Sequence, residues 1–123
     1  MTKLSTNATD DWGLTMIPVV ALSDKFVMAW EEYNGSYYQP YFVMYNNDGT
    51  VYKTRTQIHS ASQNIRVTKA AAWNDDYFII TMFRSSSGSD SYVETFDSTG
   101  TTVSNYSIVN NTNPPYNNWG ASV

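Results

Sequence analysis

The feature that most constrains this sequence is an internal repeat with a period of slightly more than fifty residues. When the chain is displaced by 52 positions, residues 23–29 fall on residues 75–81. A displacement of 51 positions puts residues 45–50 on residues 96–101 and aligns two Gly-Thr pairs. A period of this length indicates one supersecondary unit that is used more than once, so the fold of the unit determines the architecture.

A third alignment, by 107 positions, puts residues 10–13 on residues 117–120 and matches a Trp-Gly pair. The chain is therefore predicted to hold two full repeats, at about 12–62 and 63–113. The start of a third repeat follows at 114–123.

Each repeat contains four short apolar blocks that are rich in β-branched and aromatic residues and are separated by Gly, Asn, Asp and Ser. This pattern is typical of β-strands joined by tight turns. No segment keeps the 3.6-residue apolar period of a helix over ten or more residues. We therefore predict an all-β fold with strands at 15–22, 26–31, 38–45, 51–58, 65–73, 77–83, 92–96 and 102–109.

Four antiparallel strands in a repeat of this length predict a β-propeller blade, in which sheets pack face to face around an axis. Small residues at 19–21 and 70–72 suit the innermost strand, where space is least. Unbroken apolar runs at 26–30 and 77–83 suit strands that are covered on both faces. The third and fourth strands are expected to be outer and partly wet.

The residues also resemble a known family. Residues 20–30 and 41–50 are similar to the blade repeats of bacterial β-propellers, in which a Leu-Ser-Asp-Gly-x-Phe-Val-Val-x-Trp hairpin precedes a Phe-Asp-x-x-Gly-Thr turn. The second repeat keeps this turn at 96–101, but Met82 stands where the first repeat has Trp30. The resemblance implies a propeller from a large secreted or surface protein, and propellers serve binding, catalysis and scaffolding alike.

Two blades alone would leave two apolar blade faces in water. Because propellers contain about four to eight blades, we expect either a homo-oligomer that closes a ring head to tail or a fragment of a longer array. We favour a trimer with six blades. This arrangement resembles small fungal and bacterial lectins whose two-blade chains trimerise, although their Trp-rich ligand motifs are not reproduced here.

The two ends of the chain are equivalent in the repeat, so residues 1–16 and 108–123 would compete for one position in a closed ring. We expect Trp12 and the strand after it to take this position, because that strand continues through Leu22. The segment from Pro114 onward is then expected to lie elsewhere. Ordered strands at both ends would instead favour a fragment.

Composition excludes several functional classes. The chain has no Cys, which removes disulfides, thiolate metal sites and Cys nucleophiles, and its single His59 leaves little for imidazole catalysis. A net charge of -4 without a basic cluster argues against nucleic-acid binding. No apolar run reaches the roughly 18 residues of a membrane span, and no leader precedes the first repeat, which leaves the location open.

Few residues suit catalysis or metal binding, so we predict no catalytic residue, metal or cofactor. Glu31 and Glu32 are adjacent in a strand and therefore point to opposite faces, unlike a glycosidase pair, and a solvated position at the strand end is expected. The Asp-rich and Asn-rich turns supply oxygen ligands of the kind that calcium prefers, but turn chemistry explains them better.

Aromatic residues near the predicted loops are better candidates, because Trp and Tyr offer flat surfaces on which sugars or partner chains stack. For the Trp and Tyr residues, packing against a neighbouring blade is the competing interpretation. The candidate ligand-binding residues are Trp12, Trp73, Tyr33, Tyr37, Tyr38, Asp75 and Asp76.

Three functions remain open at this stage. The first is a ligand-binding module of lectin type that takes a saccharide or another small ligand. The second is a structural module that only assembles. The third and least favoured is a glycosidase-like hydrolase, which would need Asp24, Asp75 or Asp76 to converge through symmetry.

Overall fold

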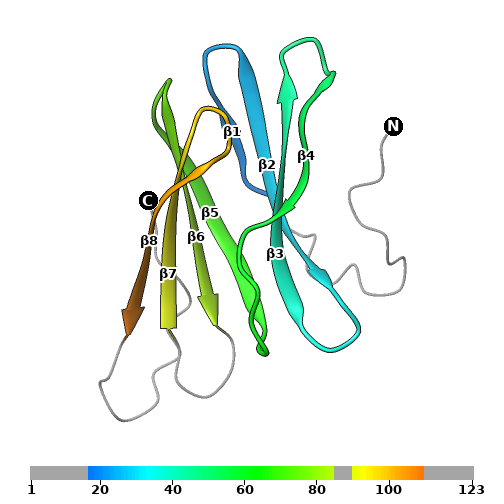
Figure 1. Ribbon diagram of the computed structural model, residues 1–123, viewed down its shortest axis with the longest axis vertical. Helices are drawn as coiled ribbons and strands as arrows, with labels where there is room; N and C mark the ends of the chain where they lie inside the picture. The colour runs from blue at the N-terminus through cyan, green and yellow to red at the C-terminus, as the bar shows by residue number, and fades with distance from the viewer. Residues whose placement is uncertain (1–16, 85–89, 110–123) are drawn as a thin grey trace.

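The computed structural model describes residues 17–84 and 90–109, and in this part of the chain all regular secondary structure is β-strand (Figure 1). Two four-stranded antiparallel sheets form, each with its strands in sequence order. The strands are β1 (Val19–Ala21), β2 (Lys25–Tyr33), β3 (Tyr38–Asn46), β4 (Val51–Gln57), β5 (Ile65–Asn74), β6 (Tyr77–Arg84), β7 (Asp90–Asp97) and β8 (Thr102–Val109).

The all-β class and the eight predicted strands are confirmed, with small shifts at the strand ends. The largest difference is at β1, which begins at Val19. Pro18 has no N–H group to donate, so it cannot extend the ladder as a normal strand residue would. Its carbonyl still accepts a hydrogen bond from the Ala29 N–H at 3.1 Å. Residues 15 and 16, also expected in this strand, lie outside the described residues.

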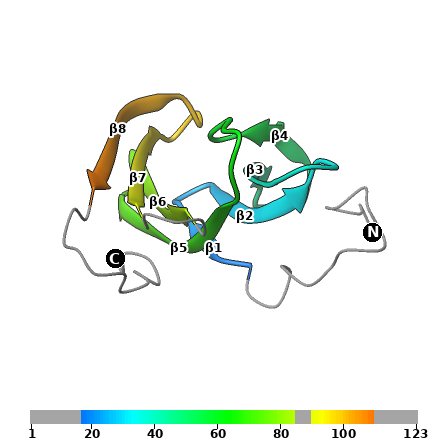
Figure 2. The same cartoon turned by 90° about the horizontal axis from the view of Figure 1, so that it is seen from below.

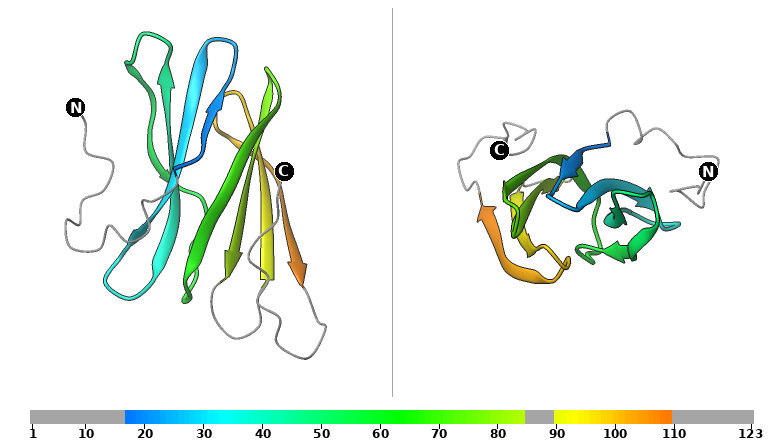
Figure 3. Two further views of the ribbon diagram at one scale, coloured as in Figure 1. Left: turned by 180° about the vertical axis from the view of Figure 1, so that it is seen from behind. Right: turned by 90° about the horizontal axis from the view of Figure 1, so that it is seen from above.

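The two sheets pack against each other through one face each. Seen roughly along the strands, β1 and β5 lie together, whereas β4 and β8 lie on opposite sides (Figures 2 and 3). One apolar core fills the contact between the sheets. Its buried members are Val20, Leu22, Val27, Ala29, Phe42 and Met44 from the first sheet and Ile65, Phe78, Ile80, Met82 and Phe96 from the second.

Three phenylalanines form the centre of this core. Phe78 and Phe96 are cross-strand partners in the second sheet, and their rings stack with centroids 5.0 Å apart and an angle of 14° between planes. Phe42 of the first sheet packs against both rings, at 5.9 Å from Phe78 and 5.0 Å from Phe96. Such aromatic contacts add to the stabilisation that burial of the rings already gives.

The same stacked pair recurs in the first sheet, where no second sheet covers it. Phe26 and Tyr45 are cross-strand partners with centroids 5.2 Å apart and an angle of 21°. These residues are the repeat equivalents of Phe78 and Phe96, at displacements of 52 and 51. The two sheets therefore share cross-strand register and ring geometry as well as sequence.

One expectation about the third strand is wrong. The sequence predicts a partly wet β3, but the strand is buried over most of its length. The reason is its position: β3 is a central strand with apolar residues on both faces, whereas β4 is an edge strand.

The β3–β4 and β7–β8 turns are also equivalent. In each, the first residue donates to the carbonyl four positions later, Asn46 to Thr50 at 2.8 Å and Asp97 to Thr101 at 2.9 Å. Each turn needs a positive φ, which is 85° at Gly49 and 76° at Gly100. Only the second turn is crowded, because a Cβ atom at Gly100 would lie 2.7 Å from Met44 Sδ and 2.7 Å from Lys53 Cδ.

This contrast gives a matched pair of variants. Gly49→Ala has free space and should lose only the backbone preference, about 1 kcal/mol of unfolding free energy. Gly100→Ala must in addition displace the buried Met44, which should lower the unfolding free energy by about 1–3 kcal/mol more. Urea unfolding followed by circular dichroism measures both. Equal losses in the two variants would contradict the packing of the β7–β8 turn against the first sheet.

Candidate functional site

The structure places the candidate ligand-binding residues at opposite ends of the strands. Trp73, Asp75 and Asp76 lie at the end that carries the β1–β2, β3–β4, β5–β6 and β7–β8 turns, here called the turn end, at the top of Figure 1. Tyr33, Tyr37 and Tyr38 lie at the other end, where β2 turns into β3. Trp12 lies outside the described residues. One site made of all these residues is therefore not formed within a single chain.

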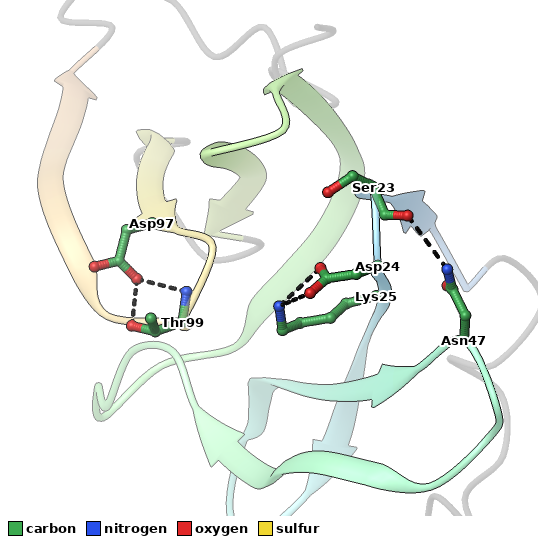
Figure 4. Close-up of polar contacts among 6 residues, drawn as sticks. All are labelled: Ser23, Asp24, Lys25, Asn47, Asp97 and Thr99. Atoms are coloured by element: carbon green, nitrogen blue, oxygen red, sulfur yellow. Dashed lines mark hydrogen bonds and ion pairs between the residues drawn. The ribbon is translucent and has the colours of Figure 1, made fainter.

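The turn end is rich in Asx and Thr side chains that hold the backbone. Lys25 Nζ contacts both carboxylate oxygens of Asp24 at 2.8 Å, and Asn47 Nδ2 donates to the Ser23 carbonyl at 3.3 Å (Figure 4). The Asp97 carboxylate accepts from the Thr99 N–H at 2.8 Å and from its hydroxyl at 2.6 Å. The contacts of Asn47 and Asp97 with backbone groups are turn chemistry, as the sequence predicts, whereas Lys25 and Asp24 form an ion pair.

Trp73 is the most exposed of the large apolar residues, with 72% of its surface accessible. It lies in β5 at a bulge between Ala72 and Asn74. The side chain of Asn74 accepts the backbone N–H groups of Asp76 at 2.8 Å and of Tyr77 at 3.1 Å. The turn beside the exposed indole is therefore held by a local cap, and Asp75 and Asp76 are exposed in it.

At the opposite end Tyr33, Tyr37 and Tyr38 lie at the turn between β2 and β3, and these three residues are called the tyrosine end here. Tyr33 and Tyr38 are cross-strand partners with rings 5.2 Å apart. The Arg66 guanidinium lies 3.8 Å from the centroid of the Tyr38 ring. Tyr37 is exposed in the loop, where its N–H donates to Asn34 Oδ1 at 2.9 Å. Flat rings, a cation and amide groups are thus gathered in one place.

The solvated positions expected for Glu31 and Glu32 are wrong, although their opposite orientations are confirmed. Glu31 points to the second sheet, where its carboxylate accepts the Val67 N–H at 3.1 Å and pairs with Arg66 at 3.2 Å. Both carboxylates are largely buried. Buried carboxylates need such partners, since an unpaired charge would be very costly. Sequence reasoning missed these partners because Arg66 is 35 positions away.

Glu32 points away from the second sheet and joins an aromatic and charged cluster. Its carboxylate accepts the Trp30 indole N–H at 3.0 Å and pairs with Arg55. The Arg55 guanidinium lies 3.9 Å from the centroid of the Tyr41 ring, which stacks on Trp30. All four residues belong to the surface of the first sheet that faces away from the second.

This surface, the far face of the first sheet, is apolar and only partly covered. Cross-strand register puts Val19 beside Met28, and Val19 is 58% exposed. Phe26, Met28 and Tyr45 on this face are half-buried, whereas Trp30, Tyr41 and Val43 are already buried in the single chain.

The corresponding far face of the second sheet is found by strand alternation. Because Phe78, Ile80 and Met82 face the first sheet, the residues between them face away. These residues are Tyr77, Ile79, Thr81 and Phe83, joined by Val93 and Thr95 from β7.

Within 17–84 and 90–109, no three or more His, Asp or Glu side chains gather so as to hold a metal ion. No helix in the same ranges is long and apolar enough to cross a membrane.

The pKa values of two carboxylates in β7 are shifted in opposite directions. Burial raises the pKa of Glu94, although the Thr102 hydroxyl, which donates to it at 2.9 Å, and the nearby His59 offset part of this effect. Partial burial alone would raise the pKa of Asp97 too, but the N–H and O–H donors of Thr99 and Thr101 outweigh it and hold that pKa below its usual range.

We therefore expect opposite pH profiles for two neutral variants. A raised pKa means that the folded state binds the proton more tightly, so Glu94 costs stability as the pH rises above the ordinary glutamate range. Glu94→Gln should gain stability relative to wild type as the pH rises from about 4 to about 7. Asp97→Asn should lose stability relative to wild type at lower pH, as the pH rises to about 4 through the region between the lowered pKa and the ordinary aspartate pKa, because the lowered pKa stabilises only the ionised form. Urea midpoints across pH measure both, and parallel profiles would contradict these environments.

Comparison with known proteins adds no relative: no family model, no curated protein and no solved structure matches the chain.

Proposed function

We propose that this chain is a self-assembling β-propeller module, in which the two sheets are consecutive blades and further copies continue the ring. The observation that carries the proposal is the repeat equivalence of the two far faces with the two faces that already pack together. The far face of the first sheet is equivalent to the packed face of the second sheet, and the far face of the second sheet is equivalent to the packed face of the first.

The equivalence can be followed along β2 and β6. The residues of β2 that face the second sheet are Val27, Ala29 and Glu31, and 52 positions later they become Ile79, Thr81 and Phe83 on the far face of the second sheet. In the reverse direction, Phe78, Ile80 and Met82 correspond to Phe26, Met28 and Trp30 on the far face of the first sheet.

A second copy placed head to tail would therefore repeat the contact that exists inside the chain. Within the chain, Phe42 packs on the stacked pair of Phe78 and Phe96. Between copies, Val93 occupies the place of Phe42 and meets the stacked pair of Phe26 and Tyr45. The half-buried state of Phe26, Tyr45 and Val93 in the single chain fits this role.

Such a contact joins two different surfaces, so it is heterologous, and it gives a ring only if the rotation closes. Because propellers contain about four to eight blades, closure takes two to four chains of this kind. Three chains with six blades is the stoichiometry that we favour. Adjoining repeats of a longer protein would serve the same faces equally well.

The test uses two valines of nearly equal exposure. Val19 (58%) is equivalent to Ala70, which packs against the core, whereas Val103 (56%) is equivalent to Tyr52, which stays 42% exposed. We expect wild type to have a multiple of the 13.9 kDa chain mass, with three chains favoured. Val19→Glu should return it to a single chain, because a charge would be buried in the contact.

Val103→Glu is the matched control and should leave the mass unchanged. Light scattering coupled to size-exclusion chromatography gives these masses, and circular dichroism verifies that each variant is folded. A wild-type protein that remains a single chain at all concentrations would overturn the proposed assembly.

A second candidate function, saccharide binding, is favoured by the tyrosine end. Tyr33 and Tyr38 present paired rings, and Arg66, Asn34 and Asn64 supply polar groups beside them. Sugars combine an apolar ring face with hydroxyl groups, so this mixture of flat and polar surfaces suits them.

A screen of the assembled protein against a broad saccharide array tests this candidate. Tyr37→Ala, which removes the exposed ring (36%), should weaken any binding by about tenfold or more. Tyr52→Ala, at an exposed site of the turn end, is the control and should bind like wild type. Binding to no saccharide, or equal binding by both variants, would contradict a site at the tyrosine end.

A further inference from the structure

Trp73 has an exposed indole, with 72% of its surface accessible. The cross-strand register identifies its counterpart in the first sheet: Ala21 pairs with Phe26 just as Ala72 pairs with Phe78. The residue after each alanine is Leu22 in the first sheet and Trp73 in the second. Leu22 is 6% exposed and belongs to the core between the sheets, whereas Trp73 is 72% exposed.

The repeat equivalence assigns the face of this side chain. Leu22 belongs to the core between the sheets, and the equivalent face of the second sheet is its far face, so Trp73, the extra residue at the bulge between Ala72 and Asn74, is assigned to that far face. Tyr77 lies on the same face and is also exposed, while its equivalent Lys25 is buried. Two neighbouring aromatic residues of the second sheet are therefore exposed where the first sheet has buried residues.

From these observations we infer that Trp73 is the main anchor of the contact between copies, and that it packs on the far face of the first sheet of a second copy of this chain. This inference rests on the assembly proposed above. Its receiving surface is the equivalent of the residues around Leu22, namely Val19, Phe26 and Tyr45 in place of Ala70, Phe78 and Phe96.

The chemistry of both surfaces suits such an anchor. Val19 is exposed, and the stacked pair of Phe26 and Tyr45 offers a flat aromatic surface to the indole. Trp is among the residues that contribute most when buried at the centre of an interface. The cap that Asn74 forms on Asp76 and Tyr77 holds the neighbouring turn, so little loop freedom remains to be lost on association.

The intrachain contact is anchored differently. There, Glu31 of the first sheet accepts the Val67 N–H and pairs with Arg66, whereas the equivalent of Glu31 on the far face of the second sheet is Phe83. The contact between copies is thus aromatic where the contact within the chain is ionic. Removal of one aromatic side chain should consequently separate the copies and leave the chain itself folded.

The experiment measures association by sedimentation over a range of concentrations, for wild type, Trp73→Ala and the control Tyr37→Ala. We expect Trp73→Ala to weaken association by about tenfold or more and Tyr37→Ala to leave it unchanged. Circular dichroism and urea midpoints should show that Trp73→Ala folds like wild type, because the side chain is exposed in the single chain.

The outcomes separate this inference from the proposed assembly. A wild-type chain that does not associate overturns the assembly and the anchor together. Wild-type association that Trp73→Ala leaves intact overturns the anchor alone. If the same variant still associates but loses binding in the saccharide screen, Trp73 is a ligand platform and the anchor is again overturned.

Discussion

Each sheet of this protein is apolar on both faces, yet the other sheet of the chain covers only one of them. Phe42, Phe78 and Phe96 close the covered side, and their burial removes a large apolar area from water. The uncovered side of the first sheet still carries the Phe26–Tyr45 pair in the same stacked geometry. The proposal of assembly follows from this imbalance, because the repeat supplies both halves of a second contact.

The charged residues give the two sides of the first sheet different characters. Toward the second sheet, Glu31 is bound by Arg66 and by the backbone of Val67, which ties the two sheets of the chain together. On the far face, Glu32 is bound by Trp30 and Arg55 within its own sheet. The far face therefore keeps its charges satisfied before any partner arrives, which lowers the desolvation cost of covering it.

Strand positions and the equivalence of the repeats could be predicted from the sequence, because period-two patterns and turn residues such as Gly49 and Gly100 are local signals. The burial of β3 could not, since it depends on which strand ends the sheet. The partners of Glu31 and the grouping of Tyr33 with Tyr38 beside Arg66 also depend on contacts between segments far apart. Propeller closure, stoichiometry and ligand class remain predictions.

The irregular strand pairs have a consequence for how chains can meet. In the described ranges, every shift of register falls on a pair that includes β4, β5 or β8, which border the sheets, while the central pairs β2–β3 and β6–β7 run without interruption. Bulged borders are poor templates for adding a foreign strand, and the carboxylate of Glu31 already occupies one border amide, that of Val67. Growth by strand addition, the route to fibres, is thereby discouraged, and stacking of whole sheets is left as the open route.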